Sequence, residues 1–314
     1  MSYLFFIMFL FGLFPSEQQK PNIIVFLVDD MGWMDTSVPF GDSIMERNRM
    51  FQTPNMDRLA QQGMKFTNAY AAPVCTPTRV SLMTGLNAAH HRITNWTSIE
   101  RDTPSDGHHI EVDKSAGKLI RDNKPIILNS NDLHSPEWNY NGYSPVEGIS
   151  HTTYATPLPE LLKKAGYYTI HVGKAHFASA GTPGASPYNL GFLINVAGNV
   201  AGMPQSYLGK ENYGNMPDKT SYYAVQNMTE YYGTDTFLTE ALTLEALKTL
   251  EQPVSTRQPF FLYMAHYAVH LPVNADSRFI QKYYEAGMDS GQAKYASMIE
   301  GMDKSLGDIM DYLK

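Results

Sequence analysis

Apolar residues in this chain gather into short, uninterrupted runs that are separated by longer polar segments. The clearest runs cover residues 23–28 (IIVFLV), 167–172 (YYTIHV) and 259–265 (PFFLYMA). They are rich in β-branched and aromatic residues and do not alternate with polar ones, which is typical of parallel strands covered on both faces. We therefore predict three buried strands, and a further short strand at residues 66–70.

Helical periodicity alternates with these runs. The spacing of apolar positions, together with Pro and Gly at the ends, predicts helices at residues 53–63, 79–84, 157–165, 234–250 and about 293–313. Helices that alternate with apolar strands indicate an α/β fold with a largely parallel central sheet and helices on both faces. In such open sheets, ligands bind beyond the carboxyl ends of the strands.

Two long segments, 95–150 and 178–232, are rich in Asn, Gly, Pro and Tyr and have few periodic apolar positions. Loops of this length inside a compact domain are usually functional, so we expect them to face a substrate. Tyr and Asn in such loops suit stacking on sugar rings and hydrogen bonding to their hydroxyls. A carbohydrate is therefore the expected class of ligand.

The amino terminus carries a separate apolar run. Residues 1–15 (MSYLFFIMFLFGLFP) are too few to span a bilayer and precede a polar stretch. We expect residues 1–19 to be a signal peptide, and the protein to be exported to the periplasm or secreted without stable membrane insertion. The alternative is a buried or frayed amino-terminal helix.

The net charge of the chain limits the kinds of molecule that it could bind. Lys and Arg number 24 against 31 Asp and Glu, a net charge of −7. Nucleic-acid binding depends on clustered Lys and Arg, so a nucleic-acid partner is not expected. A few cations inside a pocket can still hold a small anionic substrate.

Two adjacent carboxylates, Asp29 and Asp30, end the first predicted strand. They repel each other unless a cation lies between them. Ca²⁺ or Mg²⁺ fits this pair better than zinc, because no Cys/His cluster is adjacent. The alternative is that Asp30 caps a turn while Asp29 faces solvent. Asp35 lies nearby and is interpreted as a turn residue.

The other two long strands also end in polar residues. Lys174 and His176 follow the second, and His266 and His270 follow the third. A fixed cation and a titratable donor are a suitable pair to hold an anion and protonate a leaving oxygen. Of the two later histidines we expect one to be structural and His270 to belong to the site. The alternative for Lys174 and His176 is a solvated lysine and a hydrogen-bonded structural histidine.

Cys75 is the only cysteine, so no disulfide can form within the chain. It lies at the threshold of a predicted helix with Arg79 one turn further on. A helix amino terminus and a guanidinium stabilise negative charge there and lower a thiol pKa. This leaves two interpretations open: a buried small hydrophobe, or a cysteine hydrolase in which His176 or His270 is the base.

The residues around Cys75 resemble the signature of the type I, formylglycine-dependent sulfatases within the alkaline-phosphatase-like superfamily. That signature is Cys-x-Pro-Ser-Arg, three residues, then an aliphatic residue, Thr and Gly; residues 75–85 read CTPTRVSLMTG, with Thr78 in place of Ser. Weaker similarities follow in the family's order, at residues 21–30, 53–60, 173–176 and 259–272. Within residues 173–176 (GKAH), Ala175 stands where the family usually has Trp.

The resemblance implies that Cys75 is converted to formylglycine by a maturation enzyme. The hydrated aldehyde would attack sulfur through one hydroxyl, displace the alcohol, and eliminate sulfate with the help of the other. It implies that Asp29, Asp30 and the modified Cys75 bind Ca²⁺, with Mg²⁺ as the less favoured ion. Calcium takes about six to eight oxygen ligands. In the family, a strand beyond a helix such as 293–313 supplies the others.

On the substrate side, the resemblance implies that Arg79 orients the diol, Lys174 binds the sulfate, and His176 and His270 act as acid or base, with His270 also contacting substrate. We expect residues 20–314 to be a sulfatase amino-terminal catalytic domain, incomplete at its carboxyl end, with the carboxyl-terminal strands and subdomain absent.

The function that follows is a sulfuric ester hydrolase releasing inorganic sulfate, with a sulfated glycan as substrate and a small aryl or alkyl sulfate as second choice. Two alternatives stay open: a phosphomonoester or phosphonate hydrolase of the same superfamily, and a truncated, non-catalytic sulfatase homologue.

Overall fold

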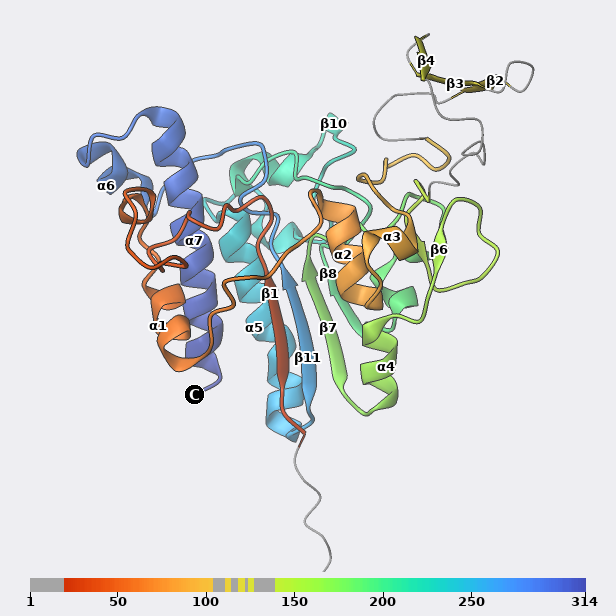
Figure 1. The fold of residues 1–314 in the computed structure, drawn as a ribbon. Helices are drawn as coiled ribbons and strands as arrows, with labels where there is room; N and C mark the ends of the chain where they lie inside the picture. The colour runs from red at the N-terminus through yellow and green to blue at the C-terminus, as the bar shows by residue number, and fades with distance from the viewer. Residues whose placement is uncertain (1–19, 104–110, 114–117, 122–123, 127–138) are drawn as a thin grey trace, which may run out of the picture.

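The computed structural model describes residues 20–103, 111–113, 118–121, 124–126 and 139–314. Its centre is a parallel four-stranded sheet in the order β1-β11-β7-β8 (Figure 1). The strands of this sheet are β1 (Ile23–Leu27), β11 (Phe260–Ala265), β7 (Tyr168–Gly173) and β8 (Ile194–Val196).

Helices lie on both faces of the sheet (Figure 1). The α-helices are α1 (Pro54–Gln62), α2 (Cys75–Thr84), α3 (Ala88–His91), α4 (Leu158–Lys164), α5 (Leu238–Thr256), α6 (Ile280–Glu285) and α7 (Ser290–Tyr312). Alternate residues of β1 pack to opposite sides: Ile24 and Phe26 join the core beneath α5 and α7, whereas Val25 joins the core beneath α2 and α4. The predicted α/β architecture is confirmed.

Short elements fill the connections. The short strands are β2 (Glu111–Asp113), β3 (Lys118–Arg121) and β4 (Lys124–Ile126) in one antiparallel sheet, β5 (Tyr143–Ser144) and β6 (Thr153–Tyr154) as a parallel pair, and β9 (Asn215–Met216) and β10 (Lys219–Thr220) as an antiparallel pair. The 3₁₀ helices are η1 (Arg47–Met50), η2 (Pro183–Ala185), η3 (Pro187–Leu190), η4 (Gly209–Gly214) and η5 (Thr229–Tyr231). The segments expected to be loops therefore contain local structure.

The amino terminus of α1 is capped by a residue that is distant in sequence. The carboxylate of Asp303 on α7 accepts hydrogen bonds from the backbone N–H groups of Asn55 and Met56, at 3.1 and 2.8 Å. These two donors have no partner inside the helix, and a negative charge at this end also complements the helix dipole. This capping fixes α1 against α7.

The sequence predictions differ from the structure in several places. No strand forms at residues 66–70, where Phe66 and Tyr70 are 70% and 92% exposed. An isolated strand would leave its backbone groups unpaired, and no described strand lies beside this segment to bond with it. The structure adds β8, which the pattern did not indicate, and it begins α2 at Cys75 instead of Arg79.

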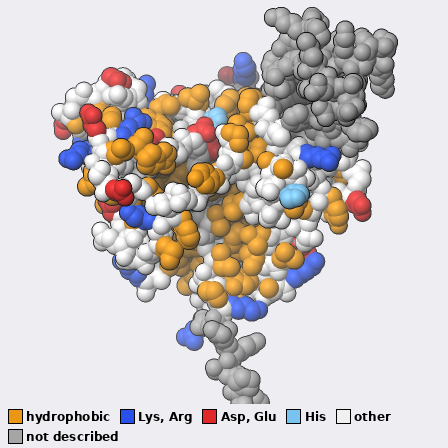
Figure 2. All heavy atoms as spheres, in the orientation of Figure 1, with side chains coloured by type: hydrophobic (Ala, Val, Ile, Leu, Met, Phe, Trp, Pro, Cys, Tyr) orange, Lys and Arg blue, Asp and Glu red, His pale blue; other side chains and the backbone are white. Residues whose placement is uncertain are grey.

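One face of the sheet is only partly covered. Figure 2 shows hydrophobic side chains gathered in the hollow over β1, between α1 on one side and α2 and α4 on the other. Exposed apolar residues on these helices are Leu59, Leu82 and Leu161. Within the described ranges β1 pairs with β11 alone, so it is an edge strand there.

No helix in the described part of the chain is long and apolar enough to cross a membrane. The predicted signal peptide, residues 1–19, lies outside the described residues.

Candidate active site

The predicted site residues meet at the carboxyl end of the central sheet. Asp29 and Asp30 follow β1 after one residue, Lys174 directly follows β7, and Cys75 is the first residue of α2. In parallel strands these ends share one edge, which is why residues so far apart in sequence come into contact.

Asp29 is the anionic centre of this group. Its buried carboxylate accepts hydrogen bonds from Nη2 of Arg79, at 3.2 Å, and from Nζ of Lys174. Burial by itself raises the pKa of Asp29, but the positive charges of Arg79 and Lys174 outweigh burial and hold that pKa below its usual value. Asp29 is therefore ionised at neutral pH.

Two buried cations flank this carboxylate. Arg79 lies one turn along α2 from Cys75, and its Nη1 also donates to the backbone carbonyl of Lys174 at 2.8 Å. Burial lowers the pKa of Lys174, and the charge of Arg79 lowers it further, while Asp29 opposes both effects. The positive charge of Lys174 thus depends on Asp29 staying ionised.

His176 faces residue 75 through one ring nitrogen. Its Nδ1 lies 3.3 Å from Sγ of Cys75, and its Nε2 lies 2.9 Å from the carbonyl oxygen of Thr97. Because a carbonyl only accepts, Nε2 must carry the hydrogen, so the lone pair of Nδ1 points at residue 75. Burial, with the nearby charge of Lys174, lowers the pKa of His176 to about 3. The ring is therefore a neutral hydrogen-bond acceptor, where the sequence suggested a titratable donor.

The backbone holds this ring closely. His176 has φ +48°, in the left-handed region, and its N–H donates to the carbonyl of Asn199 at 3.0 Å. A Cβ at Gly202 would lie 2.5 Å from Cε1 of His176, so only glycine fits against the imidazole there. Neither Thr97 nor Gly202 was identified from the sequence: Thr97 acts through its backbone, and a glycine in a Gly-rich loop is a weak signal.

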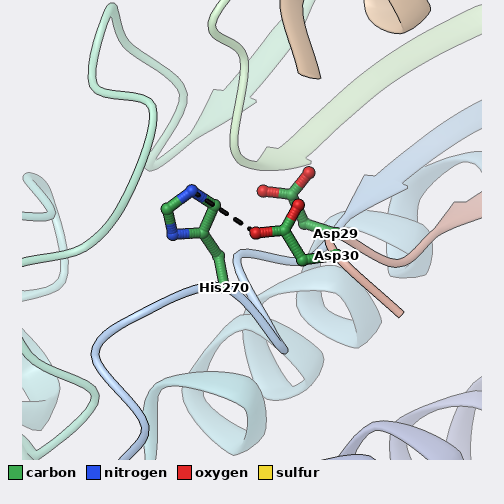
Figure 3. A group of neighbouring side chains, drawn as sticks. All are labelled: Asp29, Asp30 and His270. Atoms are coloured by element: carbon green, nitrogen blue, oxygen red, sulfur yellow. Dashed lines mark ion pairs between the residues drawn. The ribbon is translucent and has the colours of Figure 1, made fainter. Parts of the chain in front are cut away.

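The two histidines after β11 differ in environment. His270 is partly exposed, and its Nε2 lies 3.6 Å from Oδ2 of Asp30 (Figure 3). His266 is fully buried, its Nε2 lies 2.9 Å from Oγ of Ser305 on α7, and burial lowers its pKa to about 3. The structure therefore places His266 in the core and His270 at the open side of the site.

Asp29, Asp30 and His270 could hold a metal ion. One ligand atom from each lies within 4.8 Å of the others (Figure 3). An ionised buried carboxylate next to an exposed one supplies the hard oxygen ligands that Ca²⁺ and Mg²⁺ prefer. Imidazole nitrogen is not a typical ligand for those ions, so the two carboxylates carry the fit, and they supply part of an oxygen shell of about six to eight.

Asp35 and Ala175, which the sequence also singled out, lie outside the cluster around Asp29. Asp35 accepts from the N–H of Gly32 at 3.2 Å and from Nε of Arg47 at 2.7 Å, so it is the turn residue that the sequence indicated. Ala175 is buried and packs in the apolar cluster that also contains Phe177. Alanine at position 175, where the family usually has Trp, therefore packs within the apolar core beneath the site.

Comparison with known proteins places the chain in a family. The sulfatase family model matches residues 21–116 and 127–314, so the chain belongs to the sulfatase family. N-acetylgalactosamine-6-sulfatase of Mus musculus is 29% identical over 314 residues, which cover 96% of this chain and 48% of that protein. A sulfatase of Formosa agariphila is 27% identical over 334 residues, covering 95% of this chain and 54% of that protein.

The fold is also similar to solved structures. The crystal structure of Ps i-CgsB superposes with a TM-score of 0.63 at 24% identity, covering 94% of this chain and 55% of that one. The chain thus spans about half the length of the relatives that it matches. The family predicted from residues 75–85 and the alkaline-phosphatase-like fold are both confirmed.

Proposed function

We propose that this chain carries the nucleophile and the anion-binding residues of a sulfuric ester hydrolase that releases inorganic sulfate from a sulfated glycan. The observation that carries the proposal is the position of residue 75. It opens α2, lies within 3.3 Å of a neutral imidazole nitrogen, and adjoins the buried cluster of Asp29, Arg79 and Lys174. The names of the Mus musculus relative and its homologues support a sugar sulfate as substrate.

In this proposal Cys75 is converted to formylglycine, whose hydrate supplies a hydroxyl nucleophile. His176 accepts a proton from a hydroxyl of residue 75 at Nδ1, because that nitrogen carries the free lone pair. Arg79 fixes the orientation of residue 75 from one helical turn away. The low pKa of His176 keeps this nitrogen unprotonated over the physiological range, so its lone pair is free to accept a hydrogen bond from residue 75.

Asp29 and Asp30 hold a Ca²⁺ ion, which when bound polarises the sulfate oxygens. Both oxygens of Asp29 are engaged by Arg79 and Lys174. With a cation at Asp29, Lys174 would share that carboxylate, and its ammonium group would be available to the sulfate. Lys174 then serves as a sulfate ligand in the loaded site.

His270 lies at the open side of the site, next to Asp30. From this position it contacts the substrate and delivers a proton to the alcohol oxygen that leaves. His176 is buried and hydrogen-bonded to Thr97, so it cannot take this part. The two histidines therefore divide the work: His176 removes a proton from the nucleophile, and His270 protonates the leaving group.

We also propose that residues 1–19 are a signal peptide, that residues 20–314 are the amino-terminal catalytic domain, and that the protein is exported to the periplasm or secreted. The segment 75–85 is then the substrate of a formylglycine-generating maturation enzyme, which acts before or during export.

The test is to express the protein together with a formylglycine-generating enzyme. Mass spectrometry should find the peptide that contains residue 75 about 18 Da lighter than its cysteine form, as replacement of CH₂SH by CHO requires. In the presence of Ca²⁺, sulfate release from an aryl sulfate should exceed phosphate release from the matched aryl phosphate, and Cys75→Ala should abolish it. An unmodified thiol that retains full activity would contradict the proposal, and faster phosphate release would favour the phosphohydrolase alternative.

A further inference from the structure

A second hollow lies beside the candidate active site, and no residue discussed above as catalytic or metal-binding lines it. Its volume is about 550 Å³. This side pocket is enclosed by Ile99, residues 185–186, residues 198–200, residues 220–222 and Gln226. It is thus built from the loop after β8 and the turn after β10, and its volume falls within the range of about 300–1,000 Å³ that is common for ligand pockets.

The side pocket shares its wall with the support of His176. The carbonyl of Asn199, a lining residue, accepts the backbone N–H of His176 at 3.0 Å. The carbonyl of Thr97 accepts Nε2 of the same histidine, and Ile99, close by on that segment, lines the pocket. The opposite nitrogen of the ring faces residue 75. The pocket therefore adjoins His176 on the β8 side of the sheet.

Among the described residues that line the pocket, none is charged. It presents hydroxyl groups, the side-chain amides of Asn199 and Gln226, and the ring of Tyr222. An anionic group placed here would find no opposite charge, so the sulfate itself belongs with Lys174 and not in this pocket. Neutral hydrogen-bonding groups around one aromatic ring instead suit a molecule with several hydroxyls and an apolar ring face.

Two of these side chains have free binding capacity. Tyr222 is 83% exposed, and no described residue forms a hydrogen bond or ring contact with its side chain. Asn199 uses its Oδ1 to accept the N–H of Ala201 at 2.7 Å, which fixes the side chain. In the described part of the chain nothing bonds to its Nδ2, so two donors remain for a ligand.

We propose that the side pocket binds the neutral sugar ring of the sulfate ester. Tyr222 packs against the ring face, and Asn199 and Gln226 donate to its hydroxyls. This assignment rests on the sulfatase function proposed above and adds to it the residues that select a sugar over an aryl group. An aryl alcohol offers no ring hydroxyls to Asn199 and Gln226, so nothing holds it against Tyr222.

The kinetic test compares two substrates in the mature protein with Ca²⁺. The ratio of kcat/KM for 6-sulfated N-acetylgalactosamine to that for nitrophenyl sulfate should fall about tenfold in Tyr222→Ala, the loss expected for one aromatic contact. Tyr222→Phe should keep the ratio, because the ring remains. Tyr284→Ala is the matched control: Tyr284 is an exposed tyrosine on α6, outside the pocket lining. An unchanged ratio in Tyr222→Ala would overturn the proposal.

A binding test separates this proposal from the proposed function. Saturation-transfer NMR with unsulfated N-acetylgalactosamine needs neither formylglycine nor catalysis. Signal transfer to the sugar in the wild type and in Tyr284→Ala, lost in Tyr222→Ala, would support the pocket even if neither sulfate ester were hydrolysed, a result that would count against the proposed function alone. Transfer that is equal in all three proteins, or absent from all, would overturn the pocket.

Discussion

Asp29→Asn is predicted to destabilise the folded chain by removing a buried charge. The carboxylate of Asp29 lies between two cations that are almost fully buried: Arg79 is 1% exposed and Lys174 is 0% exposed. An asparagine has nearly the same shape but no charge. The variant therefore tests charge compensation in the site with little change in packing.

Removing one partner of a buried ion pair typically costs about 3–5 kcal/mol, because the remaining charge is left uncompensated in the interior. Here two cations lose their shared anion and also repel each other. Lys174 can relieve part of this cost by releasing its proton, since burial and Arg79 already lower its pKa. We therefore expect a loss near 3 kcal/mol, which corresponds to a fall in Tm of roughly 5–10 °C for a chain of this size.

Asp30→Asn is the matched control. Asp30 is 58% exposed and has only a distant contact with His270, so its substitution should change stability by less than about 0.5 kcal/mol. Thermal unfolding is measured in EDTA and again with added Ca²⁺. In EDTA only Asp29→Asn should unfold early, whereas the rise in Tm on adding Ca²⁺ should shrink in both variants. Equal melting temperatures for the two variants in EDTA would refute the reasoning.

Two further predictions concern histidines. His171, His176 and His266 have pKa values of about 3 in the folded chain, mainly because of burial, against about 6.5 unfolded. Between these values only the unfolded chain takes up the protons, so the free energy of unfolding falls as pH drops below about 6.5, by up to about 1.4 kcal/mol per pH unit for each histidine. Urea unfolding at several pH values should show a shallower fall of this free energy with pH in His266→Gln than in the wild type. Gly202→Ala places a Cβ 2.5 Å from the ring of His176, so it should lower the free energy of unfolding by about 1–3 kcal/mol and remove most of the sulfate release. Gly41→Ala is the control: its Cβ would meet no atom within 4 Å, so neither stability nor sulfate release should change.

The long strands and helices were predictable because buried elements require apolar residues at regular positions in the sequence. β7 and β11 are covered on both faces, and their uninterrupted apolar runs follow from that. β8 is only three residues long and half-buried, so it leaves no such pattern. Residues 66–70 have strand-like composition but no neighbouring strand. Whether a partner is present is a property of the fold, and the local sequence does not contain it.

The candidate site was also predictable only in part. Asp29 and Lys174 could be selected because parallel strands bring their carboxyl ends to one edge, whatever lies between them in the sequence. What the sequence could not give is how they are paired. The carbonyl of Thr97 determines which ring nitrogen of His176 carries the lone pair that faces residue 75. Because every residue has a backbone carbonyl, the sequence does not indicate which one forms this contact.

The partner of Lys174 could not be predicted from the sequence either. Its position after a strand indicates a residue that binds an anionic substrate, but in the structure its ammonium group is bound to Asp29. If Asp29 binds Ca²⁺ as proposed, the ion and Lys174 would compete for one carboxylate. Without Ca²⁺ the ammonium of Lys174 is held by Asp29; with Ca²⁺ bound it would be free to contact sulfate. Sulfate should accordingly bind more tightly when Ca²⁺ is present, and Ca²⁺ should bind more tightly in the presence of sulfate by the same factor, since coupling between two sites is reciprocal.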